Sequence, residues 1–144
     1  MSDNYVVGYD GSDASKRAVE FALNRAKASG STLTIAHILE WSPYTFLTPE
    51  ELEERHKRRS EELERASVAV LDPIKKSTAD SGVEVDTVIK YGHVADTLCA
   101  IAKDNGSAQI FIGRSGDSQM ATRLFGSVAG SLAQTAPVPC TIVP

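Results

Sequence analysis

The sequence is poor in cysteine, in aromatic residues and in long apolar runs, and each shortage argues against a class of protein. Its two cysteines, Cys99 and Cys140, form no Cys-x-x-Cys pair and have no histidine at ligand spacing, so we interpret both as small buried side chains. No window approaches the roughly 18 apolar residues of a membrane span, and the first residues do not resemble a secretory signal. We therefore expect a cytoplasmic protein that does not insert into membranes.

An excess of basic charge is also lacking. The formal net charge is -4 and the sequence pI is about 5.3, which disfavours nucleic acid and anionic membranes as partners. The one basic run, Arg55–Arg59, has glutamates on both sides at helical pairing distances. We interpret it as the solvated, self-paired face of a helix.

Five short apolar runs alternate with helical patterns along the chain, whose 144 residues are typical of a single domain spanning 1–144. This alternation predicts an α/β fold in which a parallel sheet is covered by helices on both faces. The expected strands are Tyr5–Asp10, Leu33–Leu39, Val83–Lys90, Ala108–Gly113 and Cys140–Val143.

Capping residues locate the first two helices. Ser12 or Asp13 begins the first helix, which ends before Gly30 and turns Ala18, Ala22 and Ala26 inward, with Val19 and Phe21 beside them. Thr48 and Glu51 can form a reciprocal capping box at the start of the second helix, with Pro49 at its first position. Pro73 lacks an amide donor and predicts a kink or break near Asp72.

Two further helices complete the pattern. One is expected from about Val94 to Asn105, with Gly106 after it, and the other begins near Gly126-Ser127 and ends before Pro137. In βαβ units, ligands bind beyond the carboxyl ends of the strands. Candidate site residues should therefore follow Asp10, Leu39, Lys90 and Gly113.

The first of these positions carries Asp10-Gly11-Ser12, a carboxylate and a flexible turn that lead into a helix N-terminus. The backbone amides of such a terminus have partial positive charge and can hold a nucleotide or a cation. The same three residues also form ordinary strand-to-helix turns, and this motif alone leaves both interpretations open.

The fourth position carries Gly113-Arg114-Ser115-Gly116, and nine further residues separate Gly116 from Gly126-Ser127 at the start of the last helix. Glycines let the backbone approach a polyphosphate closely, and the N–H groups and the Ser127 hydroxyl can donate hydrogen bonds to phosphate oxygens. The spacing therefore favours a triphosphate ligand.

This arrangement resembles the ATP-binding branch of the universal stress proteins, whose motif is Gly-x2-Gly-x9-Gly-Ser/Thr. Gly113, Gly116, Gly126 and Ser127 match the motif without a gap, and the similarity extends along nearly the whole chain. The resemblance implies an adenine nucleotide alpha-hydrolase-like fold, with a doubly wound five-stranded parallel sheet in the order 3-2-1-4-5. It also implies a homodimer formed through the last strand.

The resemblance further implies roles for individual residues. Asp10, with Gly11 and Ser12 beside it, and the backbone near Ile38 would contact adenine or ribose. Gly113, Arg114 and Gly116 would border the ribose and phosphates of ATP, bound with Mg²⁺ or Mn²⁺. The phosphate tail would be held by Gly126, Ser127 and Val128.

Several residues near this site have more than one interpretation. Asp117 could hold the divalent cation or repel the phosphates, while Arg114 and Arg123 could neutralise phosphate charge or be solvated. His37 and His93 lie at the site edge, where a packed or solvated role is favoured over catalysis or metal binding. Trp41, Tyr44 and Phe46 could form a lid, an interaction surface or part of the core.

Two functions fit these residues. In one, the protein is a regulatory ATP-binding protein whose nucleotide occupancy is sensed by a partner. In the other, it is a slow ATPase or autophosphorylating enzyme that uses the same site, although no general base is evident. The sequence lacks the aspartate after the third strand and the lysine after the fifth that a phospho-receiver domain requires. A flavodoxin-like carrier is disfavoured as well, because Gly-x2-Gly-x9-Gly-Ser is not the phosphate loop of that class.

Overall fold

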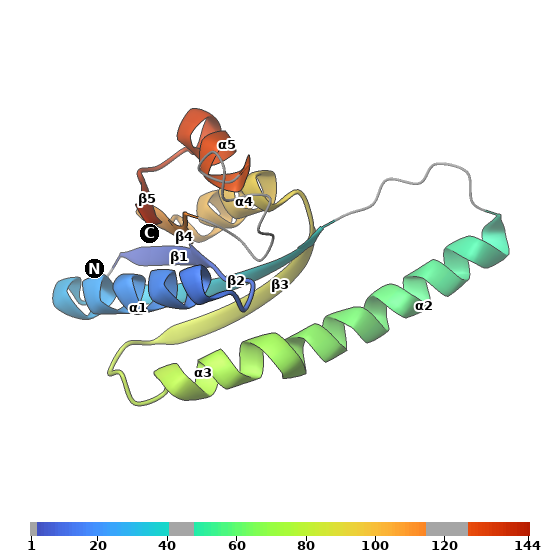
Figure 1. Ribbon diagram of the computed structural model, residues 1–144, viewed down its shortest axis with the longest axis horizontal. Helices are drawn as coiled ribbons and strands as arrows, with labels where there is room; N and C mark the ends of the chain where they lie inside the picture. Colours follow the sequence, from blue (N-terminus) through green and yellow to red (C-terminus); the bar gives the residue numbers. More distant parts are fainter. Residues whose placement is uncertain (1–2, 41–47, 115–126) are drawn as a thin grey trace.

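The computed structural model describes residues 3–40, 48–114 and 127–144, and its centre is one parallel sheet (Figure 1). The strand order is β3-β2-β1-β4-β5, which confirms the order implied by the resemblance. All four neighbouring pairs are parallel. The strands are β1 (Asn4–Gly8), β2 (Thr32–Glu40), β3 (Val85–Gly92), β4 (Gln109–Gly113) and β5 (Cys140–Val143).

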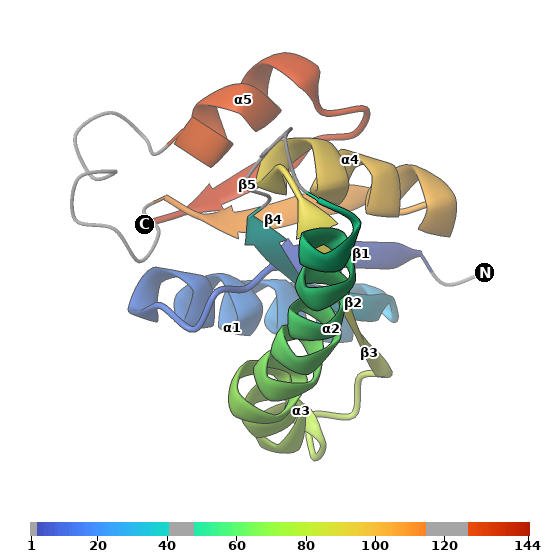
Figure 2. The same cartoon turned by 90° about the vertical axis from the view of Figure 1, so that its right-hand side faces the viewer.

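Helices cover both faces of the sheet (Figure 2). One face packs against α1 (Asp13–Ser29) and α3 (Asp72–Thr78), and the other against α4 (Val94–Asn105) and α5 (Ser127–Thr135). Alternate residues of a strand point to opposite faces, so Val6 and Ile110 pack with Leu98 and Leu132, whereas Val7 and Phe111 pack with Val19 and Leu33. The doubly wound α/β architecture predicted from the sequence is confirmed.

The predicted ends of α1 are confirmed, but one of its predicted inner residues is wrong. Ser12 accepts a hydrogen bond from the Ser15 amide as N-cap, and Gly30 closes the helix with φ of 69°. Ala18, Ala22 and Ala26 are buried, whereas Phe21 is 43% exposed. Phe21 lies at the border of the packed face, where its ring is tilted against that of Phe111 at a centroid distance of 6.0 Å.

Pro73 was predicted to kink or break the helix near Asp72, and the break does not occur. The helix α2 (Pro49–Ala66) begins with the predicted capping box of Thr48 and Glu51 and passes through a π-helical turn, Ser67–Leu71, directly into α3. Pro73 lies in the first turn of α3, where a missing N–H is tolerated, and the wider π-helical turn precedes it. No helix in the described ranges has the length and apolarity that a bilayer crossing requires.

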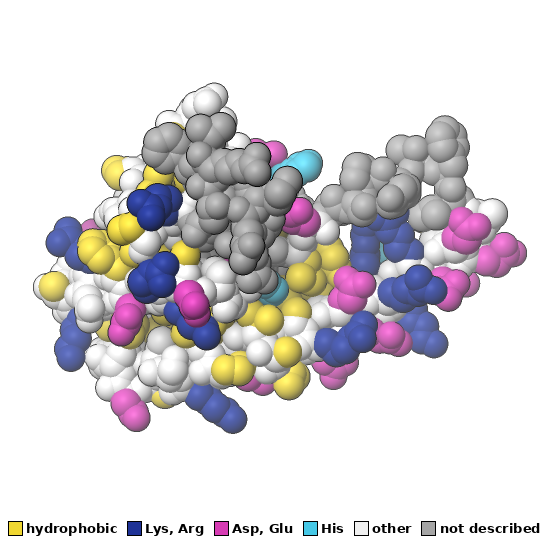
Figure 3. Space-filling view, viewed as in Figure 1, with side chains coloured by type: hydrophobic (Ala, Val, Ile, Leu, Met, Phe, Trp, Pro, Cys, Tyr) yellow, Lys and Arg dark blue, Asp and Glu magenta, His cyan; other side chains and the backbone are white. Residues whose placement is uncertain are grey.

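The outer part of α2 extends past the sheet and carries mixed charges along its length (Figure 3). None of its residues is buried. Tyr91 of β3 contacts α2 in two ways. Its hydroxyl donates to the Glu62 carboxylate at 2.5 Å, and its ring centroid lies 5.3 Å from the Arg59 guanidinium carbon. The described contacts of α2 with the sheet therefore gather at its carboxyl half.

Tyr91 gives this attachment a pH dependence. Burial and the hydrogen bond to Glu62 raise the pKa of Tyr91 to about 12, from 10.0 for a free phenol. Because the folded chain holds the phenol proton more tightly, the stabilisation is complete below pH 10 and is lost as the pH rises towards 12. Urea denaturation should show wild type losing stability in this window and Tyr91→Phe losing less. Equal losses in the two proteins would contradict this assignment.

Candidate functional site

The carboxyl edge of the sheet brings the predicted site residues together. Asp10 follows β1, Ile38 lies near the end of β2, and Gly113 ends β4. The first turns of α1 and α5, which contain Asp13 and Ser127, lie on the same side of the molecule as the ends of β4 and β5 (Figure 2). Of the predicted residues, Gly116, Gly126, Asp117, Arg123, Trp41, Tyr44 and Phe46 lie outside the described residues.

The turn after β1 is held by its own side chains. The Ser12 amide donates to Asp10 Oδ1 at 2.9 Å, and the Ser12 hydroxyl accepts from the Ser15 amide at 3.2 Å. Gly11 has φ of 84°, and a Cβ placed there would meet no atom of the described residues within 4 Å. The Ser12 hydroxyl therefore serves the helix cap, and the open side of Gly11 gives a ligand access to the turn.

Ile38 presents backbone groups that no strand uses. The bonds from the Thr32 amide to Asp3 and from the Tyr9 amide to the Ala36 carbonyl show that even-numbered residues of β2 direct their backbone towards β1. The β1–β2 ladder ends at the pair Gly8–Ala36. The N–H and C=O of Ile38 therefore extend past the end of β1, and no described residue bonds to them.

His37 has a structural partner at the same edge. Its Nδ1 lies 2.8 Å from the Tyr9 carbonyl oxygen, which requires the ring to donate at this nitrogen. The imidazole is buried and ties the end of β1 to β2. Burial, and then the Asp10 carboxylate, raise the pKa of Tyr9 beside it. His37 thus positions the turn that carries Asp10. His93 is the N-cap of α4 but makes no side-chain cap hydrogen bond.

Gly113 is required by packing against the first turn of α1. A Cβ at this position would lie 2.9 Å from the Ala14 carbonyl carbon in the first turn of α1. The next amide, that of Arg114, donates to the Val143 carbonyl at 2.7 Å and is therefore occupied by β5. The sequence carried no sign of the contact with Ala14, because nothing in the two segments shows how closely they approach.

This contact predicts a stability difference between two glycines. Gly113→Ala should lower the free energy of unfolding by about 1–3 kcal/mol, since the new methyl group would displace the backbone of α1. Gly130→Ala in α5 is the matched control, because a Cβ there meets no described residue outside its own helix backbone within 4 Å. It should raise stability by about 0.5–1 kcal/mol through helix propensity. Urea denaturation measures both, and a neutral Gly113→Ala would contradict the packing role.

Ser127 and Val128 begin α5, but their side chains differ in surroundings. Ser127 is exposed at the first helical position, whereas Val128 is partly buried against the core beneath α4 and α5. Any contribution of Val128 to a ligand would thus come from its backbone amide, one of the unpaired N–H groups of a helix start.

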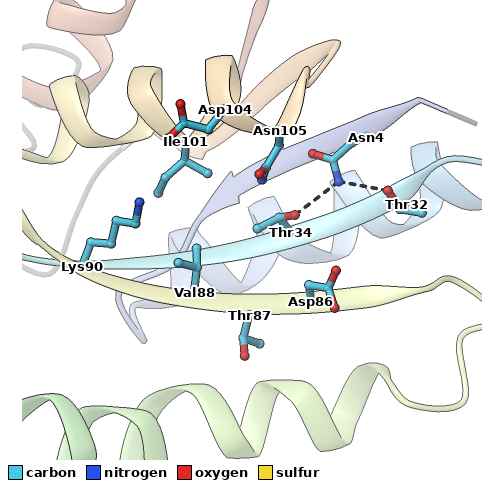
Figure 4. Close-up of a pocket in the computed structure, with 10 residues that line it drawn as sticks. All are labelled: Asn4, Thr32, Thr34, Asp86, Thr87, Val88, Lys90, Ile101, Asp104 and Asn105. Atoms are coloured by element: carbon cyan, nitrogen blue, oxygen red, sulfur yellow. Dashed lines mark hydrogen bonds between the residues drawn. The ribbon is translucent and has the colours of Figure 1, made fainter.

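Away from the carboxyl edge, a hollow lies on the α4 face of the sheet, beside the amino ends of β1 and β2 (Figure 4). It has a volume of about 420 Å³ and is lined by polar residues such as Asn4, Thr34 and Asp86. The Asn4 amide donates to the hydroxyls of Thr32 and Thr34 at 2.9 and 3.2 Å. No cluster of metal-ligating side chains occurs here or elsewhere in the described ranges.

Comparisons with known proteins agree with this architecture. The model of the Universal stress protein family matches residues 1–144. Universal stress protein YxiE of Bacillus subtilis is 27% identical over 150 residues, covering 99% of each chain.

Solved structures of universal stress proteins share this fold. Universal stress protein UspA from Lactobacillus plantarum superimposes with a TM-score of 0.84 at 24% identity, covering 100% of this chain and 99% of that one. A universal stress protein in complex with cAMP gives a TM-score of 0.71 at 26% identity, covering 99% and 96%.

Proposed function

Because the chain belongs to the universal stress protein family, we propose that residues 1–144 form one ATP-binding regulatory domain with its nucleotide at the carboxyl edge of the sheet. The observation that carries this proposal is the backbone of Ile38, to which no residue of the described ranges bonds, beside the turn of Asp10 and Gly11. The cAMP bound by a related protein supports an adenine nucleotide as the ligand class.

Adenine fits the Ile38 backbone. Its N6 amino group is a donor and the adjacent ring nitrogen is an acceptor, which complement the C=O and the N–H of one residue. Guanine presents the opposite order at these positions, so each of its groups would face one of like kind. The site should therefore prefer ATP to GTP, because a buried polar group left without a partner is costly.

The phosphates would extend from the Asp10 turn towards the first turn of α5. Helix starts carry unpaired N–H groups and partial positive charge, and both favour an anion. In this proposal Gly116, Gly126, Ser127 and the amide of Val128 hold the phosphate tail, and Arg114 neutralises part of its charge. A divalent cation, Mg²⁺ or Mn²⁺, would bind the phosphates, with the Asp117 carboxylate as a candidate ligand.

Calorimetric titration with Mg-ATP tests this function, and a single-turnover assay separates regulation from catalysis. We expect saturable binding and hydrolysis no faster than that of ATP in buffer, since no described group at the edge is placed as a general base. Binding accompanied by faster hydrolysis or by phosphate transfer to the protein would favour the slow ATPase or autokinase. Absence of binding would refute both.

The same proposal includes a homodimer through β5. This edge strand is short and uncharged, and Ile142 on it is 37% exposed, with Phe21 of the adjacent α1 43% exposed. An open apolar edge of this kind is stabilised when a second copy covers it. A cytoplasmic location is proposed with it.

Charge on β5 should weaken this dimer. Ile142→Lys would place two like charges at the two-fold interface and raise the dissociation constant by about tenfold or more. Val68→Lys is the matched control. Val68, like Ile142, is an exposed β-branched apolar residue, 61% accessible, but it lies on the π-helical turn and not on β5. Sedimentation equilibrium measures both variants. An unchanged dimer in Ile142→Lys would exclude β5 as the interface.

A further inference from the structure

The opposite edge of the sheet, β3, has a free row of backbone groups. The Leu33 amide donates to the Glu84 carbonyl, which shows that even-numbered residues of β3 direct their backbone towards β2. The N–H and C=O groups of Val85, Thr87, Ile89 and Tyr91 therefore point outward. No residue in the described ranges bonds to them.

The side chains of β3 alternate in a way that matches a reversed copy of the same strand. Asp86, Val88 and Lys90 point to the α4 face, whereas Thr87 points to the face of α2 and α3 (Figure 4). Asp86 and Lys90 are exposed, and each lies two residues from Val88. The strand thus carries opposite charges at equal distances from its centre, on one face.

We propose that β3 pairs with β3 of a second copy of this chain, antiparallel and with the two-fold axis at Val88. In this register Thr87 lies opposite Ile89 of the other copy, and Val85 opposite Tyr91, so the outward backbone groups hydrogen-bond to each other. Asp86 then lies opposite Lys90 in a position without backbone hydrogen bonds, where paired Cα atoms are only about 4.5 Å apart.

The charges select this register over its neighbours. Moving the axis by one residue to position 87 places Asp86 opposite Val88, and moving it to position 89 places Asp86 opposite Gly92. Only the axis at Val88 pairs both charged residues of the strand with opposite charge. The other pairs between Val85 and Tyr91 join β-branched or aromatic side chains, which are favourable across strands.

Such an interface would be independent of the one proposed at β5, because the two strands lie at opposite edges of the sheet. It would join two sheets into one continuous sheet through an isologous contact. Edge charges of a single sign would instead keep copies apart. The proposal does not depend on nucleotide binding, which can be measured in the same samples.

Charge exchange in the full chain tests the proposal, with Ile142→Lys present throughout to weaken association at β5. Asp86→Lys alone and Lys90→Asp alone each create two like-charge contacts and should weaken self-association by about tenfold or more. The double variant Asp86→Lys/Lys90→Asp should associate as the parent does. An equimolar mixture of the two single variants should form a mixed pair, because both of its cross-strand contacts join opposite charges.

Sedimentation equilibrium measures these species, and the matched controls are Glu20→Lys and Lys27→Glu, which change the net charge equally on exposed positions of α1. A second measurement tests the register directly. Val88→Cys should form a disulfide between copies on mild oxidation, whereas Thr87→Cys, which lies opposite Ile89, should form much less. A monomeric parent with no Val88→Cys cross-link, or single variants that associate like the parent, would overturn the proposal.

Discussion

Replacing Gly126 by leucine is expected to abolish ATP binding while the fold remains intact. In the proposed site this glycine lets the backbone approach the phosphate tail at the start of α5, and a branched side chain would occupy that space. Losing two or more charge-assisted hydrogen bonds weakens binding by about 100-fold or more. Calorimetric titration with Mg-ATP measures the change, and circular dichroism checks the fold.

Gly130→Leu is the matched control for this variant. Gly130 lies in the same helix, α5, where a Cβ would meet no described residue outside the helix's own backbone within 4 Å. This variant should bind ATP with the affinity of the wild type. Equal affinities for all three proteins would place the nucleotide away from the start of α5.

Replacing Ile38 by proline is expected to weaken ATP binding by about tenfold or more. Proline removes the one N–H that the proposal assigns to the adenine ring, and this N–H belongs to neither the β1–β2 nor the β2–β3 ladder. The preference for ATP over GTP should fall in parallel, since the same N–H discriminates between the two bases.

Ile38→Val separates the backbone effect from that of the side chain. Valine also shortens the side chain but keeps the N–H, so this variant should bind ATP within about threefold of the wild type. Competition titrations of ATP and GTP against each protein measure both affinity and preference. A loss of affinity as large in Ile38→Val as in Ile38→Pro would assign the effect to the side chain.

The order of elements and most helix ends could be predicted from the sequence because local chemistry determines them. Ser12, Gly30 and the pair Thr48–Glu51 act through hydrogen bonds and backbone conformations within a few residues. Pro73 was interpreted from the same local rules as a kink or a break, and the break, one of these two predicted outcomes, does not occur. A π-helical turn upstream places the proline in a first turn, and this turn leaves no simple sign in the sequence.

The candidate site was predicted in part, and its remaining features depend on contacts between distant segments. The rule that ligands bind beyond the carboxyl ends of the strands, together with the family resemblance, placed Asp10, Ile38 and Gly113 at one edge of the sheet, where the structure has them. The contact of Gly113 with Ala14, and the hydrogen bond between His37 and Tyr9, arise from the packing of α1 and the strands. The unpaired backbone of Ile38 follows from the difference in strand length between β1 and β2, which the predicted strand bounds only approximated.

The two edges of the sheet suggest different modes of self-association. β5 presents uncharged side chains, whereas β3 presents a charge pattern that is complementary to a reversed copy of itself. An assembly that used both edges would extend in one direction.

Chemical-shift mapping of the backbone amides during titration with Mg-ATP locates the bound nucleotide. Binding at the carboxyl edge of the sheet predicts the largest shifts at Gly11, Ile38, Gly113 and Ser127. Shifts confined to Thr34, Asp86 and Asn105, which line the hollow between α4 and β3, would contradict it.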